Sequence, residues 1–102
     1  MQQEIKAPIA ELPARLTPRA CIVTAKHGDD TVLLDVISEN YYSLNATGSR
    51  IWQWLCDDVA PADLAHRLQE TFGVSEDRAR VDVLRLLQQC AESSLFEEPW
   101  CR

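Results

Sequence analysis

The sequence lacks the patterns that would at once mark a metalloprotein, a membrane protein or a secreted protein. Its four cysteines, Cys21, Cys56, Cys90 and Cys101, include no CxxC pair, the closely spaced kind of ligand that zinc sites use. No apolar run approaches the roughly 20 residues that span a bilayer, and no apolar segment follows a basic start as in a secretory signal. We therefore expect a cytoplasmic protein with no metal and no membrane partner. We expect its thiols to be reduced, with Cys56 and Cys90 buried on apolar helical faces.

Basic residues are scarce. The chain has 10 Lys and Arg against 16 Asp and Glu, and its formal net charge is -6. Nucleic-acid binding depends on cationic side chains that replace the counterions of the phosphates. We therefore expect no nucleic-acid partner, whereas a partner with basic residues would suit this charge.

Recurrent catalytic motifs are also absent. The sequence contains no HExxH, GxSxG, P-loop or dinucleotide fingerprint. Of the two histidines, His27 falls in an expected turn and His66 on the polar side of an expected helix, and neither has a convincing catalytic neighbour. The sequence therefore predicts a protein that is not an enzyme and uses no cofactor.

The length of 102 residues fits one domain with one modest core. Residues 1–18 contain Pro8, Pro13 and Pro18 without a sustained period, which predicts an N-terminal arm. Residues 19–96 form the expected domain. Residues 97–102 form a short tail, in which we assign no function to Trp100 or Cys101.

Three short strands are expected in the first half of the domain, over residues 19–26, 31–37 and 40–44. Gly28 and its acidic neighbours favour a tight turn at residues 27–30, and a polar break follows at residues 38–40. Such short links favour an antiparallel meander. The last strand, YYSL after Asn40, has neither the Lys nor the Pro that often protects an exposed edge.

Three helices are expected in the second half. The first covers residues 46–57 with Asn45 as its N-cap, and the second covers residues 61–72. The second helix carries an apolar stripe of Leu64, Ala65, Leu68 and Phe72 and ends at Gly73. The third follows the cap Ser75 and continues to about residue 93. Its apolar set is broader than one core contact needs: Ala79, Val81, Val83, Leu84, Leu86, Leu87, Cys90 and Ala91.

The broad apolar arc of the third helix has two possible explanations: the helix is central in the core, or part of its surface binds a partner. We expect Leu95 and Phe96 to close the core, which also contains Trp52, Leu55, Leu64, Leu68 and Leu87. The resulting fold is α+β and winged-helix-like, a three-stranded antiparallel sheet followed by three helices. A bare edge strand beside an apolar helix suggests a groove in which an extended peptide adds as a strand.

Several of these segments together resemble the PqqD-like family. They are VLLD at residues 32–35, YYSLN at 41–45, TG at 47–48, IWQWL at 51–55 and RVDVLRLL at 80–87, and the resemblance covers residues 16–96. This family is known as the RiPP precursor peptide recognition element. The resemblance implies a domain that binds the leader segment of a ribosomally made precursor peptide. It also implies that a separate modifying enzyme, such as a protease or a cyclase, receives that peptide.

One turn separates this chain from part of the family. DVISEN at residues 35–40 stands where the proteins of pyrroloquinoline quinone synthesis usually carry a Tyr-Pro-Glu-Gly-like turn. The stand-alone B1 recognition proteins of lasso-peptide clusters look more similar. In the family the leader typically docks on the third strand and against the third helix.

The resemblance implies a candidate peptide-binding site on two elements. The third strand supplies Tyr41, Tyr42, Ser43 and Leu44, and the third helix supplies Val81, Asp82, Leu84, Arg85 and Gln89. A one-residue rotation of this helix, about 100°, exchanges pocket and core, so the sequence leaves its open face undetermined. Asp35 and Asp82 also have plain readings, as a turn-capping acid and a helix-surface acid.

Two functions of other classes stay open at this point. A winged-helix DNA-binding protein is compatible with the fold, although acids intersperse the arginines of the third helix. A subunit-interaction module with no peptide ligand is the other. Exposed sheet edges also make a homodimer plausible.

Overall fold

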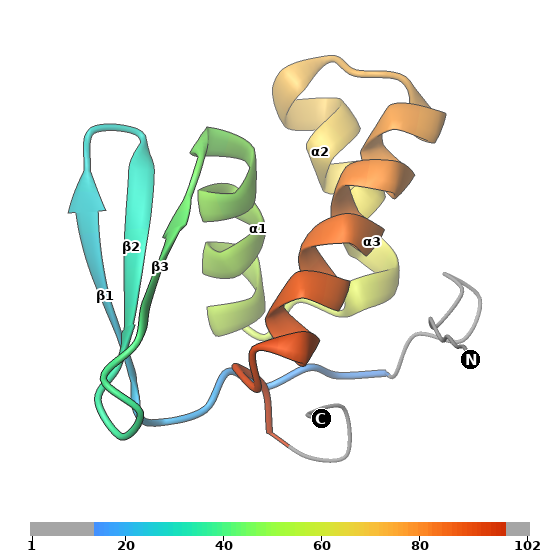
Figure 1. Ribbon diagram of the computed structural model, residues 1–102. Coiled ribbons are helices and arrows are strands. Elements are labelled where there is room, and N and C mark those ends of the chain that lie inside the picture. The colour runs from blue at the N-terminus through green and yellow to red at the C-terminus, as the bar shows by residue number, and fades with distance from the viewer. Residues whose placement is uncertain (1–13, 98–102) are drawn as a thin grey trace, which may run out of the picture.

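The computed structural model describes residues 14–97 and contains a small sheet followed by helices (Figure 1). Within these residues the elements are β1 (Ile22–His27), β2 (Asp30–Asp35), β3 (Tyr41–Leu44), α1 (Ala46–Cys56), the short 3-10 helix η2 (Pro61–Asp63), α2 (Leu64–Phe72) and α3 (Glu76–Glu92). The expected α+β class, with a three-stranded antiparallel sheet followed by three α-helices, is confirmed. Residues 1–13 and 98–102 lie outside the described part, and with them Trp100 and Cys101.

The sheet has the order β1-β2-β3, and both pairs are antiparallel. Gly28 sits in the first turn with φ of 66°, a conformation that glycine adopts without steric cost. The second turn follows Asp35, whose Oδ1 accepts from the backbone N–H of Ile37 at 2.9 Å and of Ser38 at 3.3 Å. The two turns hold β2 between its neighbours and make β1 and β3 the edges.

Two strand boundaries differ from the sequence prediction by more than one residue. The second strand ends at Asp35 instead of residue 37, because the Asp35 carboxylate binds the next amides and turns the chain. Ile37, expected in the strand, is therefore 72% exposed in the turn. The first strand begins at Ile22, since residues 20 and 21 form a turn in which the Ile22 N–H donates to the Arg19 carbonyl.

The helix boundaries follow local capping chemistry as expected. The Asn45 side chain accepts from the Gly48 N–H at 2.9 Å at the start of α1, and Ser75 accepts from the Arg78 N–H at 3.2 Å at the start of α3. Gly73 ends α2 in the left-handed conformation, with φ of 70°. Pro61 opens η2 instead of α2, which begins at Leu64.

The core lies between the sheet and the helices, all of which lie on one side of the sheet (Figure 1). The rings of Trp52 and Phe96 stack at its centre, 5.9 Å apart. Every residue predicted for the core is buried, namely Trp52, Leu55, Leu64, Leu68, Leu87, Leu95 and Phe96. The sequence pattern thus identified core positions on all three α-helices.

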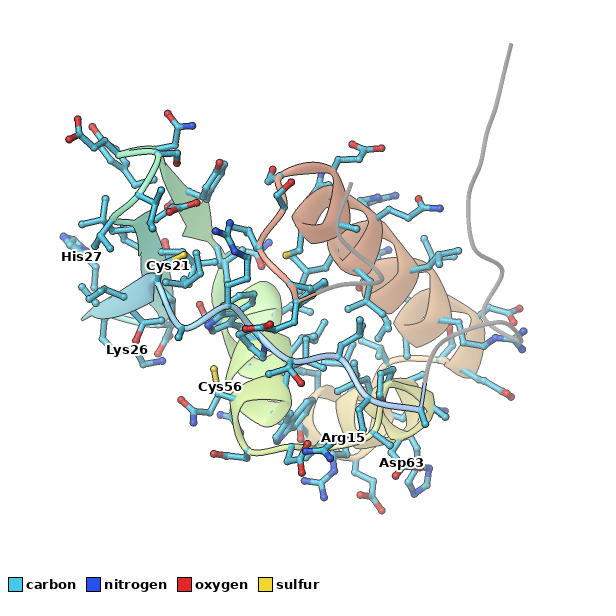
Figure 2. The ribbon with its side chains drawn as sticks, turned by 90° about the horizontal axis from the view of Figure 1, so that it is seen from below. Arg15, Cys21, Lys26, His27, Cys56 and Asp63 are labelled. Atoms are coloured by element: carbon cyan, nitrogen blue, oxygen red, sulfur yellow. The ribbon has the colours of Figure 1, made fainter. Side chains whose placement is uncertain are left out.

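Two residues expected on buried faces are exposed, Cys56 and Phe72. Cys56 lies on the outer side of α1 (Figure 2). Each stands eight residues after the first buried residue of its helix, Gly48 in α1 and Leu64 in α2. Eight residues turn an α-helix by about 80° beyond two full turns, so the side chain leaves the core stripe. Cys90, by contrast, is buried as predicted.

The segments that bracket the domain run side by side. Pro18 and Phe96 form an antiparallel bridge, the Arg19 N–H donates to the Leu95 carbonyl at 3.0 Å, and the Glu97 N–H donates to the Thr17 carbonyl at 2.8 Å. Leu16 is buried, so this part of the expected N-terminal arm contributes to the core. No helix within residues 14–97 is long and apolar enough to cross a membrane.

Candidate functional site

The outer edge of β3 has no strand partner among residues 14–97. The register pairs Leu33 with Tyr42 and Leu34 with Tyr41, and the Asp35 N–H donates to the Asn40 carbonyl at 2.9 Å. Bonded and non-bonded pairs alternate along an antiparallel ladder. Tyr42 therefore exchanges backbone hydrogen bonds with β2, whereas the N–H and C=O groups of Tyr41 and Ser43 point away from the sheet. These outward groups are a template for another strand.

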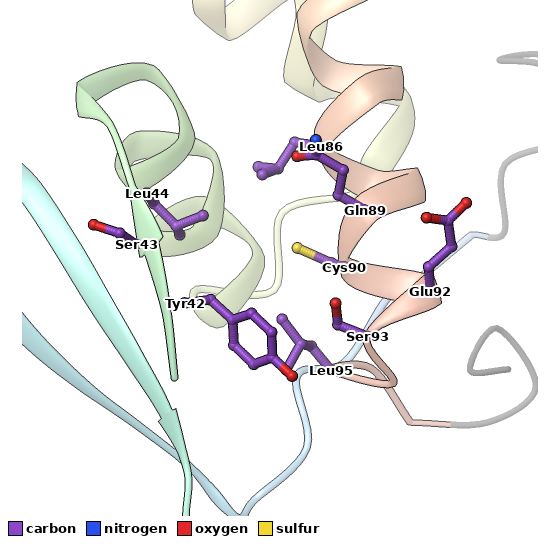
Figure 3. A pocket seen from close by; sticks show the side chains of 9 residues that line it. All are labelled: Tyr42, Ser43, Leu44, Leu86, Gln89, Cys90, Glu92, Ser93 and Leu95. Atoms are coloured by element: carbon purple, nitrogen blue, oxygen red, sulfur yellow. The ribbon is translucent and has the colours of Figure 1, made fainter. Parts of the chain in front are cut away.

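A hollow of about 330 Å³ lies between this edge and the last turns of α3 (Figure 3). Its walls are mostly apolar and come from β3, α3 and the segment after α3. They consist of Tyr42, Ser43, Leu44, Leu86, Gln89, Cys90, Glu92, Ser93 and Leu95. Tyr42 and Leu44 point from the strand toward α3, while the Ser43 hydroxyl points the other way (Figure 3).

A second hollow, of about 270 Å³, continues along the start of α1 and the first turns of α3. Ser43, Leu44, Leu86 and Gln89 line both hollows, so the two hollows adjoin each other along β3. The remaining residues of the second hollow are Asn45, Thr47, Gly48, Ile51, Arg78, Asp82 and Arg85. We call the two hollows together the β3–α3 groove.

The structure brings most of the predicted site residues to this groove, namely Tyr42, Ser43, Leu44, Asp82, Arg85 and Gln89. Tyr41 is exposed at the strand edge and lines neither hollow. Val81 and Leu84 also line neither, although Val81 is exposed. The helical period explains this, since Leu84 lies about 200° around the axis from Asp82.

The sequence prediction did not include five residues of the first hollow, Leu86, Cys90, Glu92, Ser93 and Leu95. A signal for two of them was present, because Leu86 and the C-cap Ser93 follow helical spacing from Asp82 and Gln89, on one face of α3. Choosing that face requires knowing where β3 lies, which spacing within the helix does not reveal.

The groove is apolar at its floor and carries charged side chains of α3 toward both ends. Burial raises the pKa of the Cys90 thiol to about 12, so this side chain is neutral. Asp82, with 22% of its side chain exposed, pairs with Arg78 at 3.3 Å. Arg85 has no ion-pair partner within the described residues, and neither has Glu92. An extended peptide would thus meet apolar contacts along the floor and available charges on the α3 side.

Asp35 supports the site by shaping the turn before β3. Hydrogen bonding from the Ile37 amide lowers the pKa of Asp35, against the opposing effect of burial. The Arg19 guanidinium lies 3.5 Å from the other carboxylate oxygen. The predicted turn-capping role of Asp35 is confirmed by these contacts. Within residues 14–97 no three His, Cys, Asp or Glu side chains gather as a metal site.

The family described as coenzyme PQQ synthesis protein D (PqqD) matches residues 30–95, from the start of β2 to the segment after α3. This range includes both walls of the groove and well over half of the chain. The chain belongs to the PqqD family. The resemblance seen in the sequence is thereby confirmed.

Two solved structures are similar to this PqqD-family chain. One is a lasso peptide synthetase B1 complexed with the leader peptide, with 32% sequence identity and a TM-score of 0.74, covering 82% of this chain and 99% of that one. The other is TbiB1 in complex with the TbiA(beta) leader peptide, with 27% identity and a TM-score of 0.74, covering 80% and 95%. No curated protein matches the chain.

Proposed function

We propose that this PqqD-family chain is a binding module that captures the leader segment of a ribosomally made precursor peptide. The leader adds as a strand along the free edge of β3. The observation that carries the proposal is this unpaired edge beside an apolar groove, in a chain similar to two proteins that were each solved with a leader peptide.

Backbone and side chains contribute differently to this binding. The outward backbone groups of Tyr41 and Ser43 hold the peptide main chain, which gives affinity without reading its sequence. Successive side chains of a strand point to opposite faces, so every second peptide residue turns toward α3. There Leu44, Leu86 and Leu95 offer apolar contact, which selects apolar leader residues.

The chain performs no catalysis itself in this proposal. The groove lining contains no histidine, and burial keeps the Cys90 thiol protonated, so nothing there activates a nucleophile. A separate enzyme, such as a protease or a cyclase, modifies the presented peptide. We place the protein in the cytoplasm, where ribosomes make the precursor.

Duplex DNA is a poorer ligand for this surface. Arg78 pairs with Asp82 at 3.3 Å and Arg80 with Glu76 at 3.7 Å, so two of the three arginines of α3 already face acids. Base readout needs such side chains free to reach the groove edges. The net charge of -6 further opposes binding to a polyanion.

The test compares prolines at the two opposite edges of the sheet. Ser43→Pro removes an outward N–H from β3. Thr24→Pro is the matched control, because the bonded pair of Cys21 and Val36 makes the Thr24 N–H point outward from β1. With the fluorescein-labelled TbiA(beta) leader peptide, the ligand in one of the similar solved structures, anisotropy titrations should show about tenfold or greater loss of affinity for Ser43→Pro.

Thr24→Pro should keep the wild-type affinity within about twofold, and a scrambled leader should fail to bind any variant. Circular dichroism checks that both variants retain their helices. Equal leader affinity for the two folded variants would show that the β3 edge is not the binding site.

A further inference from the structure

The sheet has a second face, turned away from all helices of the described residues (Figure 1). The register places Val23 opposite Leu34 and Leu34 opposite Tyr41, and residues in register share a face. The next row on the same face contains Ala25, Val32 and Ser43. We call these six residues the outer sheet face.

The polarity of this face is the reverse of what a solvent-facing sheet surface requires. An antiparallel sheet with one side in water normally carries polar residues there. In β1 the outward residues Val23 and Ala25 are apolar, whereas Thr24 and Lys26 point to the side of the helices and are nevertheless exposed. Packing within the domain therefore gives no reason for apolar residues at these positions.

Exposed apolar surface is concentrated in this region. The large apolar residues that are exposed within residues 14–97 are Val23, Leu34, Val36, Ile37, Tyr41, Phe72 and Val81. The first five lie on the outer sheet face or in the turn that joins β2 to β3. Val23 is 52% and Tyr41 73% exposed. Contiguous apolar surface with a polar rim is typical of a protein–protein contact.

The charges around this face indicate the kind of partner. Asp29 and Asp30 border it at one end and Glu39 at the other. Lys26 is the single Lys or Arg in the three strands, and it belongs to the opposite side because it pairs with the buried Thr31. His27, in register with Asp30, lies at the acidic end of the outer sheet face. Two copies meeting face to face would bring acidic rims together. A protein with an apolar centre and a basic rim fits better.

The outer sheet face is continuous with the proposed leader site. A peptide that adds to β3 joins the same sheet, so its outward side chains extend this face beyond Tyr41 and Ser43. We propose that the outer sheet face is the docking surface for the enzyme that modifies the bound leader-containing peptide. The identity of this partner rests on the proposed function. The enzyme would contact the domain and the leader strand added to β3 at the same time.

The test uses the protease and the cyclase that modify the precursor in the organism that makes this chain, each purified and titrated against the immobilised chain with and without leader. The double variant Val23→Thr with Leu34→Thr replaces the apolar centre and keeps residues suited to strands. It should weaken binding of one of these enzymes by about tenfold or more, while leader affinity stays within about twofold. Phe72→Gln, an exposed apolar position on α2, should leave enzyme binding unchanged.

Unchanged binding of both enzymes to the double variant would overturn the inference. The inference would also be overturned if the wild-type chain forms a dimer in sedimentation experiments and the double variant does not, because the face would then be a contact between two copies. If the double variant unfolds, amide NMR spectra of the wild-type chain, recorded with and without the enzyme, test the inference instead. Enzyme-induced broadening of the amide signals of Val23, Ala25 and Leu34 supports the docking surface, and broadening confined to signals of the helices refutes it. If the chain binds no leader, but the double variant still binds the enzyme more weakly than wild type does, the proposed function alone is refuted.

Discussion

The backbone of β3 makes two adjacent residues differ in their response to proline. The Tyr42 N–H points toward Leu33 in β2, whereas the Ser43 N–H points to the open edge. Proline has no N–H, so at position 42 it deprives the Leu33 carbonyl of its donor. Leu33 has no exposed surface, and water cannot replace that donor. Proline at position 43 leaves the ladder to β2 intact.

Comparing alanine with proline at each position separates the effect of the missing N–H on stability from the effect of the lost side chain. An unsatisfied buried carbonyl costs about 1–3 kcal/mol. The step from Tyr42→Ala to Tyr42→Pro should therefore reduce the free energy of unfolding by about 1–3 kcal/mol more than the step from Ser43→Ala to Ser43→Pro. At about 4–8 °C per kcal/mol for a domain of this size, the extra fall in Tm is about 4–24 °C.

Urea unfolding followed by tryptophan fluorescence measures these steps, because Trp52 is buried against Phe96. The comparison is valid where the four variants share one m-value. Equal steps at the two positions would contradict the assigned difference between the inward Tyr42 N–H and the outward Ser43 N–H, and a larger step at position 43 would mean that the two orientations are exchanged. The proposed pairing of a leader with Tyr41 and Ser43 would then be refuted as well.

Two further predictions concern the groove and its supporting turn. Leu86→Ala, which enlarges both hollows, should weaken leader binding by about tenfold in anisotropy titrations, whereas Leu84→Ala, outside the groove, should change it by less than about twofold. Asp35→Asn should be less stable than wild type in urea at pH 7. Because the folded-state pKa of Asp35 is lowered from 3.8, this stability difference should persist at pH 5 and shrink as the pH falls below about 4; a difference independent of pH would contradict the role of the carboxylate.

The residues that the sequence predicted well are those whose role is set by near neighbours. Asn45, Ser75 and Gly73 cap helices through bonds to amides a few residues away, or through their own backbone freedom. The core positions Leu64 and Leu68 follow from helical spacing, but the same spacing placed Phe72 wrongly, because its stripe drifts past the end of the core.

The residues that line the β3–α3 groove were predictable on the strand and only partly on the helix. Tyr42, Ser43 and Leu44 could be assigned because an unprotected last strand is visible in the sequence. On α3, Val81 and Leu84 were chosen with Asp82 and Gln89, although they do not face the groove. The polarity of α3 is similar on several faces, so composition could not select among them.

The sequence by itself determined the order of the elements, the caps of α1 and α3 and the family to which the chain belongs, because each depends on residues close together along the chain. Only the tertiary structure decided which backbone groups of β3 stay unpaired, which face of α3 lines the groove with Leu86 and Cys90, and that Val23, Leu34 and Tyr41 form one surface. These features depend on register and helix rotation, and both are fixed by contacts between residues far apart in the sequence.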